Sequence, residues 1–128
     1  MSTSKMVWAG RVLSALPSLM MLGSGGAKLA AVPEVVDMLS NKLGYPASSL
    51  PVIGALEVGS VVLYLIPQTS VLGAIVITGY LGGAIASHVR ISDPGWPTVL
   101  VLATMVWAGL GLRDSRLMAL LPIRKSSG

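Results

Sequence analysis

Long apolar stretches alternate with short polar connections along this chain. Four stretches approach the roughly 20 residues that an α-helix needs to cross a bilayer, and each contains few charged side chains. Pro67 stands where one stretch ends, and Asp93-Pro94 stands just before another begins, as prolines often do at helix boundaries. The pattern predicts four membrane-spanning helices, at residues 12–29, 49–66, 70–89 and 96–112.

A fifth, shorter helix is predicted between the first two spans, from Pro33 to Leu43. Proline is favoured at a first helical position, and Gly44 is suited to the C-cap. This helix is too short and too polar to cross a membrane, so we expect it to lie along the membrane surface. Its two faces differ at helical spacing: Val35, Val36, Leu39 and Leu43 form the apolar one, and Glu34, Asp37, Asn41 and Lys42 the polar one.

The composition supports a membrane location. Of the 128 residues, 53% are hydrophobic and 11% are charged, whereas about 25% of a soluble chain is charged. Such a chain lacks the polar side chains to cover a water-facing surface, and the four spans leave no room for a separate catalytic domain in water. We therefore expect residues 1–128 to form a single all-α domain, an integral membrane four-helix bundle with a short interfacial helix between spans one and two.

The basic residues predict an orientation in the membrane. The net charge is +4, but the positive charges gather at the chain ends, so they indicate topology rather than binding to nucleic acid. Cytoplasmic segments carry the excess of Lys and Arg, and six such residues on one side against three on the other predict a multi-pass protein of the cell membrane with both termini in the cytoplasm. The six are Lys5, Arg11, Arg113, Arg116, Arg124 and Lys125; the three are Lys28, Lys42 and Arg90.

Glu57 is an ionisable residue within a predicted span. A carboxylate inside a membrane is costly, and it marks a candidate functional site. Its neighbours along the chain offer no charge partner, so Glu57 is expected to be either protonated or paired with a base. The topology brings His88 and Arg90 to the same half of the membrane, and Lys28 is a further candidate there. We expect a polar cluster built on Glu57, His88 and Arg90.

Each of these residues has a functional and a structural interpretation. In the functional one, Glu57 and His88 are a catalytic acid/base pair, since histidine carries protons near neutral pH, and four others bind the ligand. In the structural one, Glu57 forms an ion pair that fixes helix register, His88 caps a span and Arg90 extends towards the interface. The four ligand-binding candidates are Lys28, Tyr64, Tyr80 and Arg90.

Metal and cofactor motifs are scarce in the sequence. With no cysteine and a single histidine, a four-ligand zinc site is not expected, and paired histidine ligands for haem are absent. The glycines around Lys28 lack the spacing of a phosphate-binding loop. The cofactor is therefore unknown from the sequence, with a quinone as one candidate.

Several segments together resemble the DoxX-like family of small membrane proteins. The resemblance implies a four-helix membrane bundle with polar positions at Lys28, Glu57, His88 and Arg90. The family takes its name from subunits of thiosulfate:quinone and terminal quinol oxidases, so it suggests a quinone-linked role by analogy only. The segments that carry the resemblance are Gly26–Leu29, Pro51–Glu57, Pro67–Ala74, Gly79–Arg90 and Trp107–Asp114.

Three functions remain open from the sequence, and whether the chain is an enzyme is undecided. In the first, a lipophilic small molecule such as a quinone binds beside Glu57 and His88, and the protein is an accessory to a redox partner. In the second, the same pair is the acid and base of a membrane-embedded isomerase or epoxide-opening enzyme. In the third, the protein is a structural subunit whose Gly79 and Gly83, a GxxxG pair, form the seam of a homo-oligomer.

Overall fold

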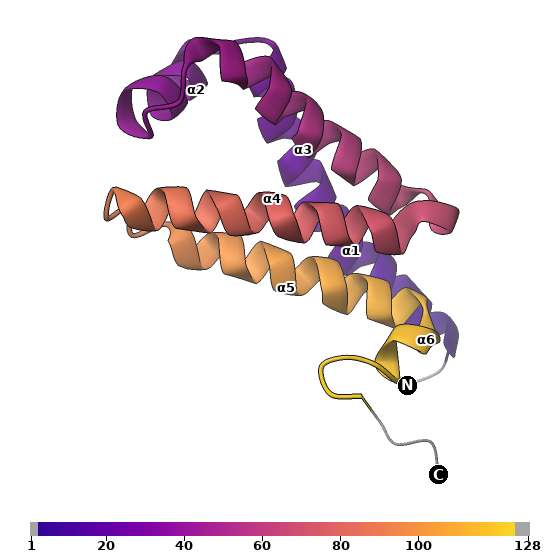
Figure 1. The fold of residues 1–128 in the computed structure, drawn as a ribbon. Helices are drawn as coiled ribbons and strands as arrows, with labels where there is room; N and C mark the ends of the chain where they lie inside the picture. Colours follow the sequence, from indigo (N-terminus) through magenta and orange to yellow (C-terminus); the bar gives the residue numbers. More distant parts are fainter. Residues whose placement is uncertain (1–2, 125–128) are drawn as a thin grey trace.

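The computed structural model describes residues 3–124, and within that range the chain is helical with no β-strand. Figure 1 shows long helices joined by short connections. Lys125, which contributed to the charge count above, lies outside the described residues. The elements in chain order are α1 (Thr3–Leu29), α2 (Pro33–Val36), the π-helix η1 (Asp37–Lys42), the 3₁₀ turn η2 (Ala47–Ser49), α3 (Leu50–Leu65), the 3₁₀ turn η3 (Pro67–Thr69), α4 (Ser70–Arg90), α5 (Trp96–Arg113) and α6 (Ser115–Met118).

Four helices, α1, α3, α4 and α5, are long and apolar enough to cross a membrane. Each overlaps one of the four predicted spans. The first helix begins earlier than predicted, at Thr3, so the polar lead-in and the first apolar stretch form one continuous helix. Many large apolar side chains point outwards, which would be costly in water but suits a lipid environment. Leu19, Val52, Leu72 and Val101 are examples.

The long helices pack in neighbouring pairs. Helix α1 contacts α3 and α5, and α4 contacts the same two helices; Figure 1 shows α4 and α5 side by side, with α1 crossing behind them. Glycines permit the two crossings of α1. A Cβ atom on Gly54 would lie 2.9 Å from the Gly25 carbonyl oxygen, and one on Gly10 would lie 2.7 Å from that of Gly109. Backbones approach this closely only where no side chain intervenes.

One buried cluster fills the interior between the long helices. Tyr64 is completely buried within it. Its hydroxyl donates to the Val106 carbonyl oxygen over 2.6 Å and lies 2.8 Å from the Ser14 hydroxyl oxygen. The Arg113 guanidinium lies 5.0 Å from the centre of the Tyr64 ring, within reach of a cation–π interaction. The apolar members of the cluster are Met21, Val61, Tyr64, Ala74, Ile77, Leu81, Val106, Leu110 and Leu117.

The connection between α1 and α3 is helical through residues 33–42, close to the short helix predicted from Pro33 to Leu43. It changes from α to π at Asp37, and the Leu43 amide accordingly reaches back to the Met38 carbonyl oxygen. Leu39 and Leu43 are buried against Leu50, so the face predicted to be apolar is the packed one. Gly44 has a φ of 82°, as expected of a helix C-cap. The position of this segment at a membrane surface stays a prediction.

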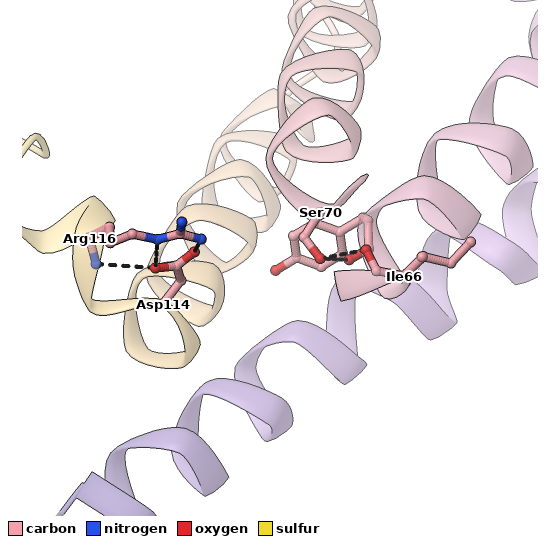
Figure 2. Close-up of polar contacts among 5 residues, drawn as sticks. Ile66, Ser70, Asp114 and Arg116 are labelled. Carbon is pink, nitrogen blue, oxygen red and sulfur yellow. Dashed lines mark hydrogen bonds and ion pairs between the residues drawn. The ribbon is translucent and has the colours of Figure 1, made fainter. Parts of the chain in front are cut away.

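Side chains close the two tight connections at the other end of the molecule. In the turn between α3 and α4, the Ser70 hydroxyl donates to the Tyr64 and Ile66 carbonyl oxygens at 2.8 and 2.9 Å. Beyond α5, Asp114 caps α6 by accepting from the Arg116 amide, and it forms a salt bridge of 2.7 Å with the Arg116 guanidinium. Figure 2 shows the contact between Ser70 and Ile66 and the contacts between Asp114 and Arg116.

Candidate functional site

A cavity of about 640 Å³ opens at the end of the molecule away from α6. The second half of α1, the 33–45 segment, the first halves of α3 and α5, and the second half of α4 form its walls. Its volume lies within the range of small-molecule sites, which combine an apolar lining with a few polar groups. The apolar lining includes Met20, Met21, Ile53, Leu81, Val99 and Leu102; the polar groups are Ser24, Lys28, Glu34, Tyr45, Glu57, Tyr80, Ser87 and His88.

A buried ion pair stands in the wall of this cavity. Lys28 Nζ lies 2.7 Å from Glu57 Oε1, and the two side chains are only 10% and 4% exposed. Lys28 also donates to the Ser24 hydroxyl oxygen over 2.6 Å. Ser24 stands four residues before Lys28 on α1, so both lie on one helix face. Pairing and hydrogen bonding are what allow two charges to be buried together.

Tyr80 completes the group from α4. Its hydroxyl donates to Glu57 Oε1 over 3.0 Å, and its ring centre lies 5.8 Å from Lys28 Nζ. Three helices therefore meet at one carboxylate. Both hydrogen bonds use Oε1, and among the described residues no group donates to Oε2. The second carboxylate oxygen of this wall residue thus has no hydrogen-bond partner within the described part of the chain.

His88 lines the same cavity but does not contact Glu57. Its Nδ1 lies 2.6 Å from the Ala84 carbonyl oxygen. A carbonyl can only accept, so Nδ1 carries the hydrogen, and Nε2 of the neutral ring is an acceptor. Tyr45 reaches this part of the wall from the 33–45 segment, with its hydroxyl oxygen 2.6 Å from that of Ser87.

The ion pair differs from the one expected from the sequence. Glu57 was expected to pair with His88 or Arg90, but among the described residues its charged partner is Lys28. The cause is the crossing of α1 and α3, where a Cβ atom on Gly54 would lie 3.1 Å from the Lys28 Cβ atom. Arg90 is the last residue of α4, ten residues or about 15 Å beyond Tyr80, and donates instead to the Leu43 carbonyl oxygen.

Tyr64, the remaining candidate ligand-binding residue, is not in the cavity wall. It lies in the buried cluster that contains Val106. Sequence reasoning also missed wall residues. Ser24 could have been found from its spacing to Lys28, whereas Tyr45 lies in an irregular connection and had no periodic signal. Across the described residues, no three His, Asp or Glu side chains come close enough together to hold a metal ion.

Comparison with known proteins identifies the family. The sequence matches the model of the DoxX-like family over residues 12–109, a stretch that includes Lys28, Glu57, Tyr80 and His88. No curated protein and no solved structure matches the chain. The family match covers most of the 128 residues and takes in most of each of the four long helices. This all-helical chain therefore belongs to the DoxX-like family.

Proposed function

We propose that this DoxX-like membrane protein binds a lipophilic small molecule in the cavity, with the polar end of that molecule at Lys28, Glu57 and Tyr80. The observation that carries the proposal is a buried ion pair, 2.7 Å between its charged atoms, in the wall of a largely apolar cavity. An ion pair contributes little to stability when its desolvation is counted. A carboxylate with one oxygen open to a cavity suits recognition better than it suits structure alone.

The surroundings of Glu57 support a role in moving protons. Its carboxylate is held by Lys28 and Tyr80 on one side, so a bound molecule meets a fixed, pre-oriented Oε2. A quinone is one candidate ligand, and in that version the protein is an accessory to a redox partner. Glu57 would exchange a proton with the bound molecule, while the partner would supply or remove electrons.

The setting of the proposal is a four-helix bundle in the cell membrane. The excess of Lys and Arg near the chain ends favours cytoplasmic termini, which would put the cavity in the opposite half of the bilayer. In this arrangement the 33–43 segment lies along the membrane surface over the cavity. A lipophilic molecule would then reach Glu57 from the bilayer without crossing water.

A second function, acid/base catalysis without electron transfer, is favoured by the presence of His88 in the same wall. Glu57 Oε2 and His88 Nε2 both lack a hydrogen-bond partner within the described residues. For catalysis, one of the two groups would have to carry an added proton. An apolar substrate between them could then lose a proton to the unprotonated group and receive one from the protonated group, as an isomerase or an epoxide-opening enzyme requires. Turnover by the purified protein with no electron partner would distinguish this function from the first.

A third function, a structural subunit, rests on Gly79 and Gly83. A Cβ atom on either glycine would meet no atom within 4 Å apart from the backbone of its own helix and its chain neighbours, so their surface is open among the described residues. A second copy could pack there as a homo-oligomer. Both glycines also border the cavity, so in this version the seam would cover part of the site.

The test is to identify the small molecules that accompany the purified protein. Wild type, Glu57→Gln and Asp114→Asn would be extracted in the same mild detergent and their lipophilic contents compared by mass spectrometry. Asp114→Asn is the matched control, because it replaces a carboxylate by an amide beyond α5 and away from the cavity. Circular dichroism and size-exclusion chromatography would establish that all three variants are folded.

We expect one lipophilic compound to accompany wild type and Asp114→Asn and to be depleted in Glu57→Gln. Identical contents in all three proteins would reject the site. A change of oligomeric state in Glu57→Gln with unchanged contents would favour the structural function instead.

A further inference from the structure

We infer that the cavity selects a lipophilic molecule whose head is an uncharged hydrogen-bond donor, such as an alcohol or a phenol, over one with a carboxylate or a head that only accepts. The inference rests on the proposed function, because it assigns the chemical class of the ligand to the same cavity. In the quinone version of that function, it favours the reduced quinol, whose hydroxyl groups donate, over the quinone, whose carbonyl oxygens only accept. The preference depends on which donor hydrogens and acceptor lone pairs of the wall residues are already in hydrogen bonds with other residues, and which are left for a ligand.

The ion pair leaves an acceptor facing the ligand. Lys28 gives two hydrogens, to Glu57 Oε1 and to the Ser24 hydroxyl oxygen, and Tyr80 gives its only hydroxyl hydrogen to the same Oε1. Glu57 Oε2 accepts nothing from the described residues. A carboxylate oxygen in an apolar wall gains most from a donor.

Another part of the wall, at Tyr45, Ser87 and His88, is also rich in acceptors. The Ser87 hydroxyl donates to the Gly83 carbonyl oxygen over 2.9 Å. The hydroxyl oxygens of Tyr45 and Ser87 lie 2.6 Å apart, and because the Ser87 hydrogen is already used, Tyr45 must be the donor in that hydrogen bond. Tyr45 has therefore used its hydrogen, and His88 has used its Nδ1 hydrogen on the Ala84 carbonyl oxygen. The Tyr45 oxygen and His88 Nε2 remain as acceptors.

The described wall residues offer fewer free donors than free acceptors. The Ser24 hydroxyl hydrogen is one, since Ser24 only accepts in its bond with Lys28. The third ammonium hydrogen of Lys28 is another, and its nitrogen lies 5.8 Å from the centre of the Tyr80 ring. Free acceptors on Glu57, Tyr80, Tyr45 and His88 thus outnumber free donors on the described wall.

The charges of the wall disfavour an anionic head. The charge of Lys28 is already balanced by Glu57, and the remaining carboxylate in the wall, that of Glu34, is negative. Apart from Lys28, the described wall residues include no lysine or arginine. A ligand carboxylate would therefore lose its hydration and gain no unbalanced cation, which is a large cost in an apolar cavity.

The inference is tested with three ligands that share one apolar body and differ in the head. The purified protein in lipid nanodiscs is titrated at neutral pH with para-octylphenol, para-octylanisole and para-octylbenzoate, and heats from empty nanodiscs are subtracted. The phenol offers an uncharged donor, the anisole only an acceptor and the benzoate an anion. We expect the phenol to bind at least about tenfold more tightly than each of the others, which is about 1.4 kcal/mol.

The variant Glu57→Gln is a second test, because it should reduce or reverse the preference for the phenol over the anisole. Lys28 and Tyr80 both donate towards Oε1, so the glutamine must turn its carbonyl oxygen to them and present its amide nitrogen to the cavity. A donor then replaces the free acceptor, and the preference for phenol over anisole should fall by about tenfold or reverse. Asp114→Asn should keep the wild-type preference.

The outcomes separate this inference from the proposal beneath it. If none of the three ligands binds wild type, the proposed function fails and the inference falls with it. If ligands bind but benzoate or anisole equals the phenol, the site stands and the inference is overturned. The wild-type comparison decides this even if Glu57→Gln does not fold.

Discussion

Lys28 and Glu57 are 29 residues apart in sequence, yet Lys28 Nζ lies 2.7 Å from Glu57 Oε1 at the crossing of α1 and α3. The crossing is close because Gly25 and Gly54 face each other, each with a Cβ position about 3 Å from the other's carbonyl oxygen. The backbone contact therefore brings a lysine at the end of α1 onto the face of α3 that carries Glu57. The same two side chains stand in the cavity wall, so their roles in stability and in recognition can be separated only by experiment.

Removal of one member of the pair should destabilise the protein more than removal of both. Lys28→Met leaves the Glu57 carboxylate buried without its cation, and such changes cost about 3–5 kcal/mol. The double variant Lys28→Met/Glu57→Leu removes both charges and should recover most of that loss. Thermal unfolding in one detergent, followed by circular dichroism, would measure both.

The matched control for this cycle is Arg116→Met. It breaks the salt bridge with Asp114, in which the Arg116 side chain is 87% exposed, and exposed pairs contribute little. Its unfolding temperature should stay close to that of wild type. A double variant as unstable as Lys28→Met would contradict the assigned pairing.

The glycines of this chain should divide into two groups when replaced by alanine. In Gly54→Ala the new methyl group would lie 2.9 Å from the Gly25 carbonyl oxygen, so α1 and α3 must move apart. In Gly79→Ala the methyl group meets nothing within 4 Å and enters the border of the cavity. We expect Gly54→Ala to lower the unfolding temperature and Gly79→Ala to leave it within error.

Gly79→Ala also tests the GxxxG pair as an oligomer seam. If Gly79 and Gly83 lie between two copies, the added methyl groups should weaken the oligomer in cross-linking or in size-exclusion chromatography with light scattering. Unchanged assembly would leave Gly79 with a role at the cavity alone.

Tyr64, which is buried, and Tyr80, which is partly buried, should have separable effects. Tyr80→Phe removes the hydrogen bond of 3.0 Å to Glu57 Oε1 and should weaken ligand binding severalfold with a small change in stability. Tyr64→Phe removes hydroxyl contacts with Val106 and Ser14 in the buried cluster and should cost about 0.5–1.5 kcal/mol with unchanged binding. Titration of the phenol and thermal unfolding of both variants would check this; weaker binding by Tyr64→Phe would contradict its position outside the cavity.

The helices followed from the sequence because hydrophobic length and proline boundaries are local signals. The starts of α4 and α5, at Ser70 and Trp96, agree with the predicted starts of spans three and four. Thr3 was missed as the start of α1 because residues near Lys5 and Arg11 are too polar for a span, although a helix can extend beyond the apolar thickness of a membrane. The π-helix at Asp37 was missed because no residue pattern marks the extra residue in such a turn.

The partner of Glu57 could not be deduced from the sequence. His88, Arg90 and Lys28 all reach the same half of the predicted bundle, and hydrophobic periodicity does not give the rotation of one helix against another. The choice is made by the Gly25–Gly54 contact, which requires knowing which glycines face each other. Tyr80 was one of the ligand-binding candidates, and the structure brings its hydroxyl to Glu57; its role in binding stays a prediction.

The cap of α6 should weaken in acid through one titration. The guanidinium of Arg116, which hydrogen-bonds to the carboxylate, holds the pKa of Asp114 below its ordinary value of 3.8. Because the folded state binds this proton less readily than the unfolded state, the stabilisation is fully present above the unfolded pKa and is lost as the pH falls through the lower, folded pKa. The protection of the Arg116 amide, which donates to Asp114 Oδ1 over 3.1 Å, should therefore decline as the pH falls below about 3.8. Amide hydrogen exchange, corrected for intrinsic rates, would measure this protection.

Asp114→Asn is the control, because asparagine is also a good N-cap residue but has no carboxylate to protonate. The protection of the Arg116 amide in this variant should not change over the same pH range. An equal decline in that variant would show that another group is responsible.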